Sequence, residues 1–256
     1  MSASAFTRRV ARLIGVVLLA ACAAGSAMAA PAHAADPLTY ANLIASPEQT
    51  AGTLRTFLAL TALSLVPMAL ICMTSFVRIT IVLSMLRHAI GLQDSPPNMV
   101  LISLALFLTA FSMQPTLQKI NDEAVTPFME NRLNVGMTVQ RAVVPLKAFM
   151  IRQTREADLA LMVEISGAPM PTAEAEVSLV QLVPAFMLSE LQAAFQIGFV
   201  LFLPFLLVDL VVSGVLMSLG MMMVPPATIS IPVKILLFVL IDGWNLVIRS
   251  LLGTIH

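Results

Sequence analysis

The stretch that decides the fold is Leu191–Val224, LQAAFQIGFVLFLPFLLVDLVVSGVLMSLGMMMV, which is almost wholly apolar and holds one charge, Asp209. As a straight helix it would extend about 51 Å, against about 30 Å of bilayer hydrocarbon. The run therefore predicts a membrane helix that is too long to span the bilayer upright. Pro204 removes one backbone hydrogen bond inside it and favours a kink. Both features predict packing against other protein rather than a helix surrounded by lipid.

The composition supports a membrane protein. Of 256 residues, 59% are hydrophobic and 11% are charged, with a mean hydropathy of +0.93, whereas soluble domains carry roughly 25% charged residues. Lys and Arg total 14, as do Asp and Glu, so no net positive charge attracts nucleic acid. Nucleic acid is excluded as a partner on this ground. Two cysteines are too few for a disulfide framework.

Four hydrophobic segments predict an all-α membrane protein. They are Leu54–Met85 (interrupted by Pro67 and Arg78), Asn98–Met113, Leu191–Val224 and Ile229–Leu252. We expect a first helical hairpin over 54–115 and a second over 185–252, with a short extension at 35–53 and a tail at 253–256. The segment 116–184 holds about half of the charged residues, with apolar positions at helical spacing. It is expected to form amphipathic helices outside the membrane.

Residues 1–34 are typical of a cleaved signal peptide. Arg8, Arg9 and Arg12 precede an apolar run, and small residues with A-x-A sites follow. Cys22 stands in a lipoprotein-like box and offers lipidation as an alternative. Cleavage near Ala29–Ala34 is favoured, because the later spans already anchor the chain.

The signal peptide also predicts orientation. Cleavage places the mature N-terminus outside the inner membrane. Arg87 and His88 then lie in a short cytoplasmic turn, in agreement with the positive-inside tendency. The charged segment 116–184 is consequently expected on the periplasmic side.

No catalytic group is expected. His88 and His256 are far apart in the sequence, and there is no phosphate-binding loop, dinucleotide fingerprint or metal-ligand spacing. The chain is predicted to be no enzyme and to hold no metal or cofactor.

Ionisable residues in the second hairpin are the first candidate site. Asp209, Lys234 and Asp242 interrupt apolar runs, and such groups normally face protein or water. A turn centred at Pro225-Pro226 would place Asp209 opposite Asp242, and one centred at Met221-Met222 would place it opposite Lys234. Either register remains open, and an ion relay is the alternative to structural pairing.

Three consecutive methionines at the hairpin tip are the second candidate. Met221, Met222 and Met223 cannot share one helix face. Their flexible, polarizable side chains suit a deformable apolar seal, and core filling is the competing interpretation.

The stretch Pro184–Phe199, PAFMLSELQAAFQIGF, resembles the signature of the FliP family of flagellar export proteins. Its signature residues here are Pro184, Phe186, Glu190, Phe195 and Gly198. Similar stretches are Thr74–Ile79 with Leu83–Arg87, Pro96–Asn98, and Met221–Pro226 continuing to Asp242–Trp244.

The resemblance implies a function and partners. In that family about five copies assemble with FliQ and FliR into a cone-like helical channel, which works with FlhA and FlhB and conducts unfolded flagellar proteins. It implies a methionine gasket at Met221–Met223, a functional pair at Asp209 and Lys234, and further buried polar groups at Glu190 and Asp242. It also implies the bacterial inner membrane and the flagellar basal body as the location, with lipid around the complex.

Three alternatives stay open for the function. The equivalent export-gate subunit of a virulence injectisome is disfavoured, because those counterparts generally lack the signal peptide that this sequence predicts. An ion-coupled secondary transporter is disfavoured because the sequence shows no internal repeat. A scaffold that assembles without conducting is the third.

Overall fold

The computed structural model describes residues 47–92, 95–167, 169, 173, 176–221 and 223–255. The signal peptide at 1–34, its alternative lipidation at Cys22 and the middle methionine of the tip, Met222, lie outside the described residues. The extension predicted at 35–53 is described only from Pro47.

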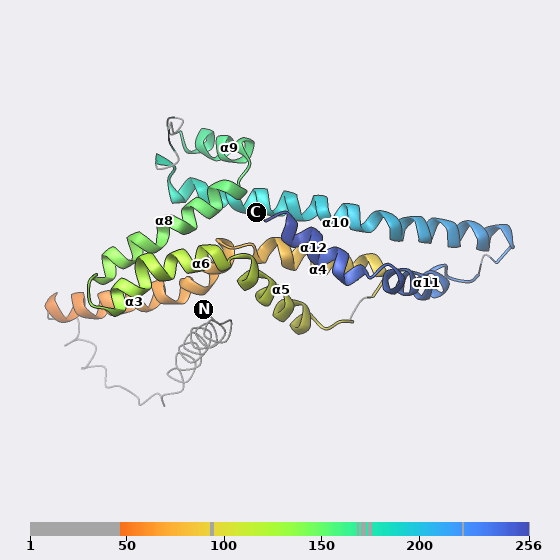
Figure 1. The fold of residues 1–256 in the computed structure, drawn as a ribbon, viewed down its shortest axis with the longest axis horizontal. Coiled ribbons are helices and arrows are strands. Elements are labelled where there is room, and N and C mark those ends of the chain that lie inside the picture. Colours follow the sequence, from red (N-terminus) through yellow and green to blue (C-terminus); the bar gives the residue numbers. More distant parts are fainter. Residues whose placement is uncertain are drawn as a thin grey trace, which may run out of the picture. The chain divides into compact units, whose positions relative to one another are not determined.

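All regular structure in the described part of the chain is helical, as predicted. The helices are α3 (Pro47–Cys72), α4 (Phe76–Ile90), α5 (Asn98–Ser112), α6 (Gln114–Ile120), the π-helix η2 (Asn121–Val125), α7 (Thr126–Met129), α8 (Val135–Gln153), α9 (Glu156–Ser166), α10 (Leu179–Ser218), α11 (Ala227–Leu240) and α12 (Gly243–Gly253) (Figure 1). The chain divides between Ser64 and Leu65 into two compact units. The second unit carries both candidate sites.

Two helices of the described residues are long and apolar enough to cross a membrane, Leu54–Cys72 and Leu179–Ser218. The pairs Asn98–Ser112 with Gln114–Met129 and Ala227–Leu240 with Gly243–Gly253 are bent by 63° and 67°. Counting each bent pair as one span gives up to four, which is the number of hydrophobic segments in the sequence. The first segment divides differently from the prediction, because α3 ends at Cys72 and a separate helix, α4, begins at Phe76.

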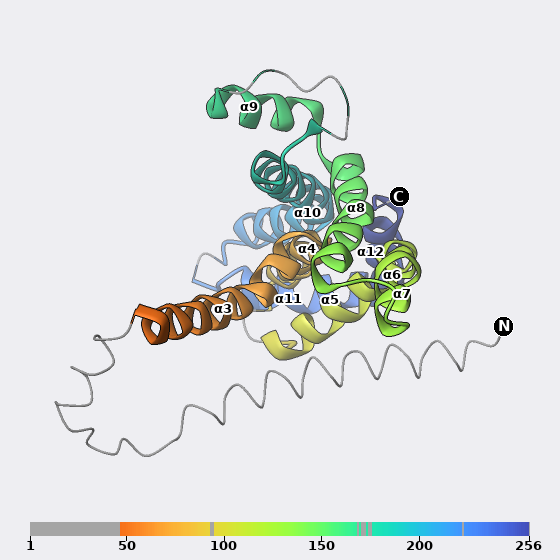
Figure 2. The ribbon, with the colours of Figure 1, turned by 90° about the vertical axis from the view of Figure 1, so that its left-hand side faces the viewer.

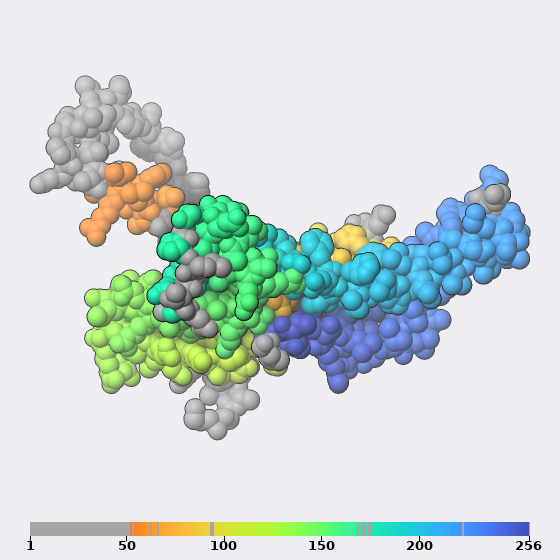
Figure 3. All heavy atoms as spheres, turned by 90° about the horizontal axis from the view of Figure 1, so that it is seen from above, coloured from red at the N-terminus to blue at the C-terminus, as the bar shows by residue number. Residues whose placement is uncertain are grey.

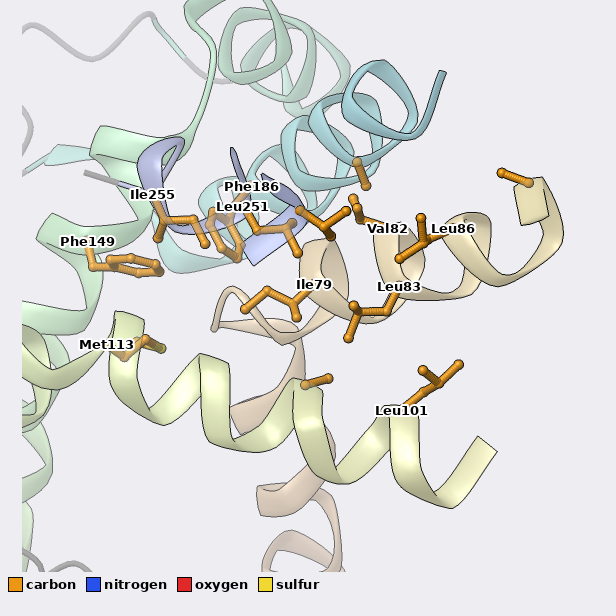
Figure 4. Packing of buried hydrophobic residues seen from close by; sticks show 14 of the residues in the cluster. Ile79, Val82, Leu83, Leu86, Leu101, Met113, Phe149, Phe186, Leu251 and Ile255 are labelled. Carbon is orange, nitrogen blue, oxygen red and sulfur yellow. The ribbon is translucent and has the colours of Figure 1, made fainter. Parts of the chain in front are cut away.

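Helix α4 forms the core of the second unit. It packs between α10 and α5 (Figure 2). Ile79, Val82, Leu83, Leu86 and Ala89 are buried along it at three- and four-residue spacing. Figure 4 shows the cluster, with Phe149 of α8, Phe186 of α10 and Leu251 of α12 joining α4. The apolar residues at helical spacing form one face of α4, and this face explains why the helix lies inside the unit.

The charged segment 116–184 consists of helices α6 to α9 with the π-helix η2, and it ends in the first residues of α10. The side chain of Asn134 caps α8 by accepting from the Met137 N–H at 2.8 Å. The α8 helix buries Pro145, Phe149 and Met150 and packs on η2, α6 and α10. Helix α8 therefore joins the core of the second unit.

Helix α10 is continuous over 40 residues and passes through Pro184 and Pro204. It ends in a Schellman-type turn, in which the Gly220 N–H donates to Met217 O at 3.1 Å and the Met221 N–H to Leu216 O at 3.0 Å. Gly220 has φ +76, a conformation that favours glycine. Pro225-Pro226 then lead into α11. These residues fix where the hairpin turns.

Candidate functional site

An ion pair joins the two helices on either side of the tip. Lys234 Nζ of α11 lies 2.6 Å from Asp209 Oδ2 of α10. Of the two registers that are compatible with the sequence, the structure has the one that places Asp209 opposite Lys234. The Lys234 side chain is 7% exposed and that of Asp209 is 41% exposed, so the cation is the buried partner.

Lys234 has a second acceptor on a third helix. Its Nζ donates to Ala89 O at 3.3 Å, one of the last carbonyls of α4, where a helix leaves acceptors unpaired and carries partial negative charge. Beside it, Gly91 at φ +91 brings the end of α4 close to Ile231 of α11. Lys234 therefore fastens α11 to both α10 and α4.

The tip itself is exposed. Met221 is 43% exposed and Met223 is 98% exposed. Figure 3 shows this end of α10 projecting beyond α11. The two described methionines of the tip therefore contribute little to the core of the single chain, which argues against the core-filling interpretation for them.

The structure contains a second ion pair, which the sequence pattern does not reveal. Arg78 of α4 donates through Nε to Glu190 Oε2 at 2.9 Å and through Nη2 to Glu190 Oε1, so that the contact is bidentate. The two side chains are 4% and 1% exposed. Nη1 of Arg78 donates to Thr254 O at 2.8 Å, and Nη2 donates to Gln153 Oε1 at 3.1 Å. One guanidinium thus connects α4, α8, α10 and the C-terminal segment.

Two signals in the sequence point to the members of this pair. Arg78 interrupts an apolar run, and a charge in such a place needs a partner. Glu190 is expected to be a buried polar residue, and it is buried. The link between them was missed because the two residues are 112 positions apart.

The environment of Asp242 differs from the one predicted. Its side chain was expected to be buried, but it is exposed in the single chain. It lies at the bend between α11 and α12 with φ 50, and it forms no pair with Asp209. At the same bend a Cβ on Gly243 would lie 2.2 Å from the Phe238 ring, so the chain turns tightly against α11.

The signature residues occupy different environments along α10. Phe186 is fully buried, while Phe195 is 57% exposed and Pro184 is also exposed. At Gly198, a Cβ would lie 2.3 Å from Met85 Sδ of α4. The glycine therefore permits close approach of the two central helices.

Comparison with known proteins identifies the family. The FliP family profile matches residues 59–251. The chain is 50% identical over 215 residues to the flagellar biosynthetic protein FliP of Bacillus subtilis (strain 168), covering 83% of this chain and 97% of the relative. It is 48% identical over 253 residues to the FliP of Caulobacter vibrioides, covering 98% of this chain and 93% of the relative. It is also 52% identical over 199 residues to the FliP of Pectobacterium carotovorum, covering 78% and 77%. The chain therefore belongs to the FliP family.

Proposed function

We propose that this chain is a core subunit of the flagellar protein export gate and forms part of the wall through which unfolded flagellar proteins leave the cell. As a FliP family member it is a non-enzymatic membrane component of the flagellar export apparatus. In this proposal the tip of the second hairpin closes the channel.

The contact between Asp209 and Lys234 supports this proposal most directly. It joins α10 and α11 across the hairpin at 2.6 Å, and Lys234 extends the connection to the end of α4. The tip is thereby held on two anchored helices, while Met221 and Met223 stay exposed. In an assembly of about five such chains around an axis, Met221, Met222 and Met223 would form an apolar ring that blocks ions when closed.

The proposed location is the bacterial inner membrane within the flagellar basal body, with 116–184 on the periplasmic side. The proposed partners are FliQ, FliR, FlhA and FlhB, with membrane lipid around the complex and unfolded flagellar proteins as cargo. The large exposed apolar surface of α10 supports assembly. In the apolar 18-residue stretch of α10 that could cross a membrane, only 11% is buried in the single chain. Exposed apolar surfaces of this kind mark interfaces.

A structural role for the ion pair is better supported than an ion relay. Lys234 is held by a carboxylate and a backbone carbonyl at once, and Asp242, the third member of the suggested relay, lies elsewhere on the exposed bend. We therefore assign Asp209 and Lys234 to positioning the tip.

Replacing the three tip methionines with alanine tests the gasket. The assembled gate of the triple variant is expected to leak small ions, because alanine leaves the constriction too wide to exclude hydrated ions. Conductance across planar bilayers containing the purified complex measures this. Met217→Ala is the matched control, since Met217 lies on α10 just before the tip and is 67% exposed.

Two results would oppose the proposal. An assembled triple variant as tight to ions as the wild type would remove the gasket from the tip. A wild-type complex that never conducts, even during export of cargo, would favour the non-conducting scaffold.

A further inference from the structure

A small apolar cavity lies between α4, α5 and the α11–α12 bend, away from the tip. Its volume is about 180 Å³. The apolar residues around it are Leu83, Leu86, Ile90, Leu92, Pro96, Leu101, Ile235, Phe238, Val239 and Trp244, and Arg87 is the one charged residue among the described residues that line it. Figure 4 shows part of this wall, with Leu83 of α4 pointing toward α5, on which Leu101 lies.

The cavity suits a hydrocarbon guest. An apolar cavity of roughly 150 Å³ stays free of water and takes up apolar molecules. On one side the cavity is bounded by Ile235 and Val239 of α11, which are 39% and 68% exposed. Because α11 belongs to a candidate membrane span, this side lies where lipid chains are available.

Arg87 adds a recognition element for an anion. Its Nη1 is occupied, donating to Asn98 Oδ1 at 2.6 Å and to Pro96 O at 3.3 Å. Its Nε is buried and has no acceptor among the described residues, and Nη2, on the same edge of the guanidinium, forms no hydrogen bond there either. A buried donor without an acceptor is costly.

The structure contains a direct comparison for that edge. Arg78, on the same helix, presents Nε and Nη2 to both carboxylate oxygens of Glu190. This fork matches carboxylate and phosphate groups and forms strong charge-assisted bonds. Arg87 presents the same fork with its other nitrogen anchored, so the fork is oriented but has no anionic partner in the part of the chain that the structure describes.

We propose that this cavity and Arg87 form a binding site for an anionic phospholipid, with part of one acyl chain in the cavity and the headgroup phosphate on the Nε–Nη2 edge of Arg87. Both parts of the site match this ligand, since a free anion would leave the cavity empty, and a zwitterionic lipid carries a quaternary ammonium that offsets its phosphate charge beside the guanidinium. The site holds lipid between the α4–α5 turn and the last hairpin. It depends on the membrane location and is independent of the gasket.

The chain provides its own reporter. Trp244 lines the cavity and is the single tryptophan of the sequence. Full-length protein in detergent would be titrated with phosphatidylglycerol carrying brominated acyl chains, which quench tryptophan fluorescence on contact, and separately with brominated phosphatidylcholine. Phosphatidylglycerol is expected to quench Trp244 with about tenfold higher apparent affinity, because no headgroup cation offsets the attraction between its phosphate and Arg87.

Three variants sharpen the test. Arg87→Gln removes both the charge and the fork, and is expected to reduce the preference to about twofold or less. Arg249→Gln, at an exposed arginine on α12, is the matched control and should keep the preference. Val239→Phe fills the cavity mouth and leaves the Arg87 contacts intact, so it should weaken quenching by both lipids even if Arg87→Gln fails to fold.

Several results would overturn the proposal. They are equal quenching by the two lipids, an unchanged preference in Arg87→Gln, or unchanged quenching in Val239→Phe. Displacement of phosphatidylglycerol by excess inorganic phosphate would indicate a free-anion site instead. Absence of quenching in the complete export-gate complex, with quenching in the isolated chain, would show that a neighbouring subunit fills the cavity.

Discussion

At the residue scale, the buried pair of Arg78 and Glu190 is expected to contribute strongly to the stability of the fold. Removing one member, as in Arg78→Met, leaves the Glu190 carboxylate buried without its cation and should destabilise the fold by about 3–5 kcal/mol. The double variant Arg78→Met with Glu190→Met should be less destabilised than either single variant. Denaturation of the purified protein in detergent, followed by circular dichroism, measures this. Arg132→Met is the control, because Arg132 pairs with Glu130 on the surface with side chains 74% and 47% exposed. Additive losses in the double variant would contradict the coupling.

The pair near the tip should respond unequally to loss of its members. Asp209→Ala leaves a 7% exposed lysine with only a backbone acceptor, whereas Lys234→Ala leaves a carboxylate that is 41% exposed and partly solvated. Both variants should impair export of flagellar proteins, because both release the tip, but Asp209→Ala should be the less stable. Culture-supernatant assays measure export, and thermal unfolding measures stability. Lys234→Ala as the less stable variant would indicate that the carbonyl contact at Ala89 matters more than the charge.

At the scale of the helices, Gly198 permits the close packing of α4 on α10. Gly198→Ala places a Cβ 2.3 Å from Met85 Sδ, so the methionine must move, at an expected cost of about 1–3 kcal/mol. Met85→Ala in the same chain should restore most of the loss. Gly214→Ala is the control on the same helix, since a Cβ there meets nothing within 4 Å, and it should be neutral or stabilising by about 0.4–1 kcal/mol. Equal effects of the two glycine substitutions on thermal unfolding would contradict this account.

The sequence predicted these elements well where the signal was local. Helical composition and apolar runs identified the segments, and the predicted tip matches the turn, because Gly220 and Pro225-Pro226 act on their own neighbourhood. The register of the hairpin remained ambiguous, since a shift of the turn by a few residues exchanges Lys234 for Asp242 opposite Asp209. The bond from Arg78 to Glu190 was out of reach, because two residues 112 positions apart leave no periodic pattern. The division of the first apolar run into α3 and α4 was likewise missed, since its hydrophobicity continues across the break.

At the scale of the whole molecule, the apolar surface of the second unit exceeds what its own fold can cover. Phe199, Leu207 and Leu210 on α10 are 59%, 64% and 75% exposed. By contrast, Glu190, a polar residue nearer the start of the same helix, is fully buried. A lipid environment alone would cover this surface without fixing any geometry. Neighbouring copies would cover it and bring the tips together, as the gasket requires.

The assembly can be measured directly. Protein purified in mild detergent is expected to have the mass of several copies, and Leu210→Asn should shift it toward the single chain, because an amide at a packed apolar interface loses its hydrogen bonds to water. Val180→Asn is the matched control, being 83% exposed in the first turn of α10, and should leave the mass unchanged. Native mass spectrometry distinguishes these states. A single chain for the wild type, or an unchanged mass in Leu210→Asn, would mean that α10 faces lipid and that the tips are not gathered by this surface. A wild type that stays a single chain would also leave the tip methionines without neighbouring copies, so they could not close a common pore.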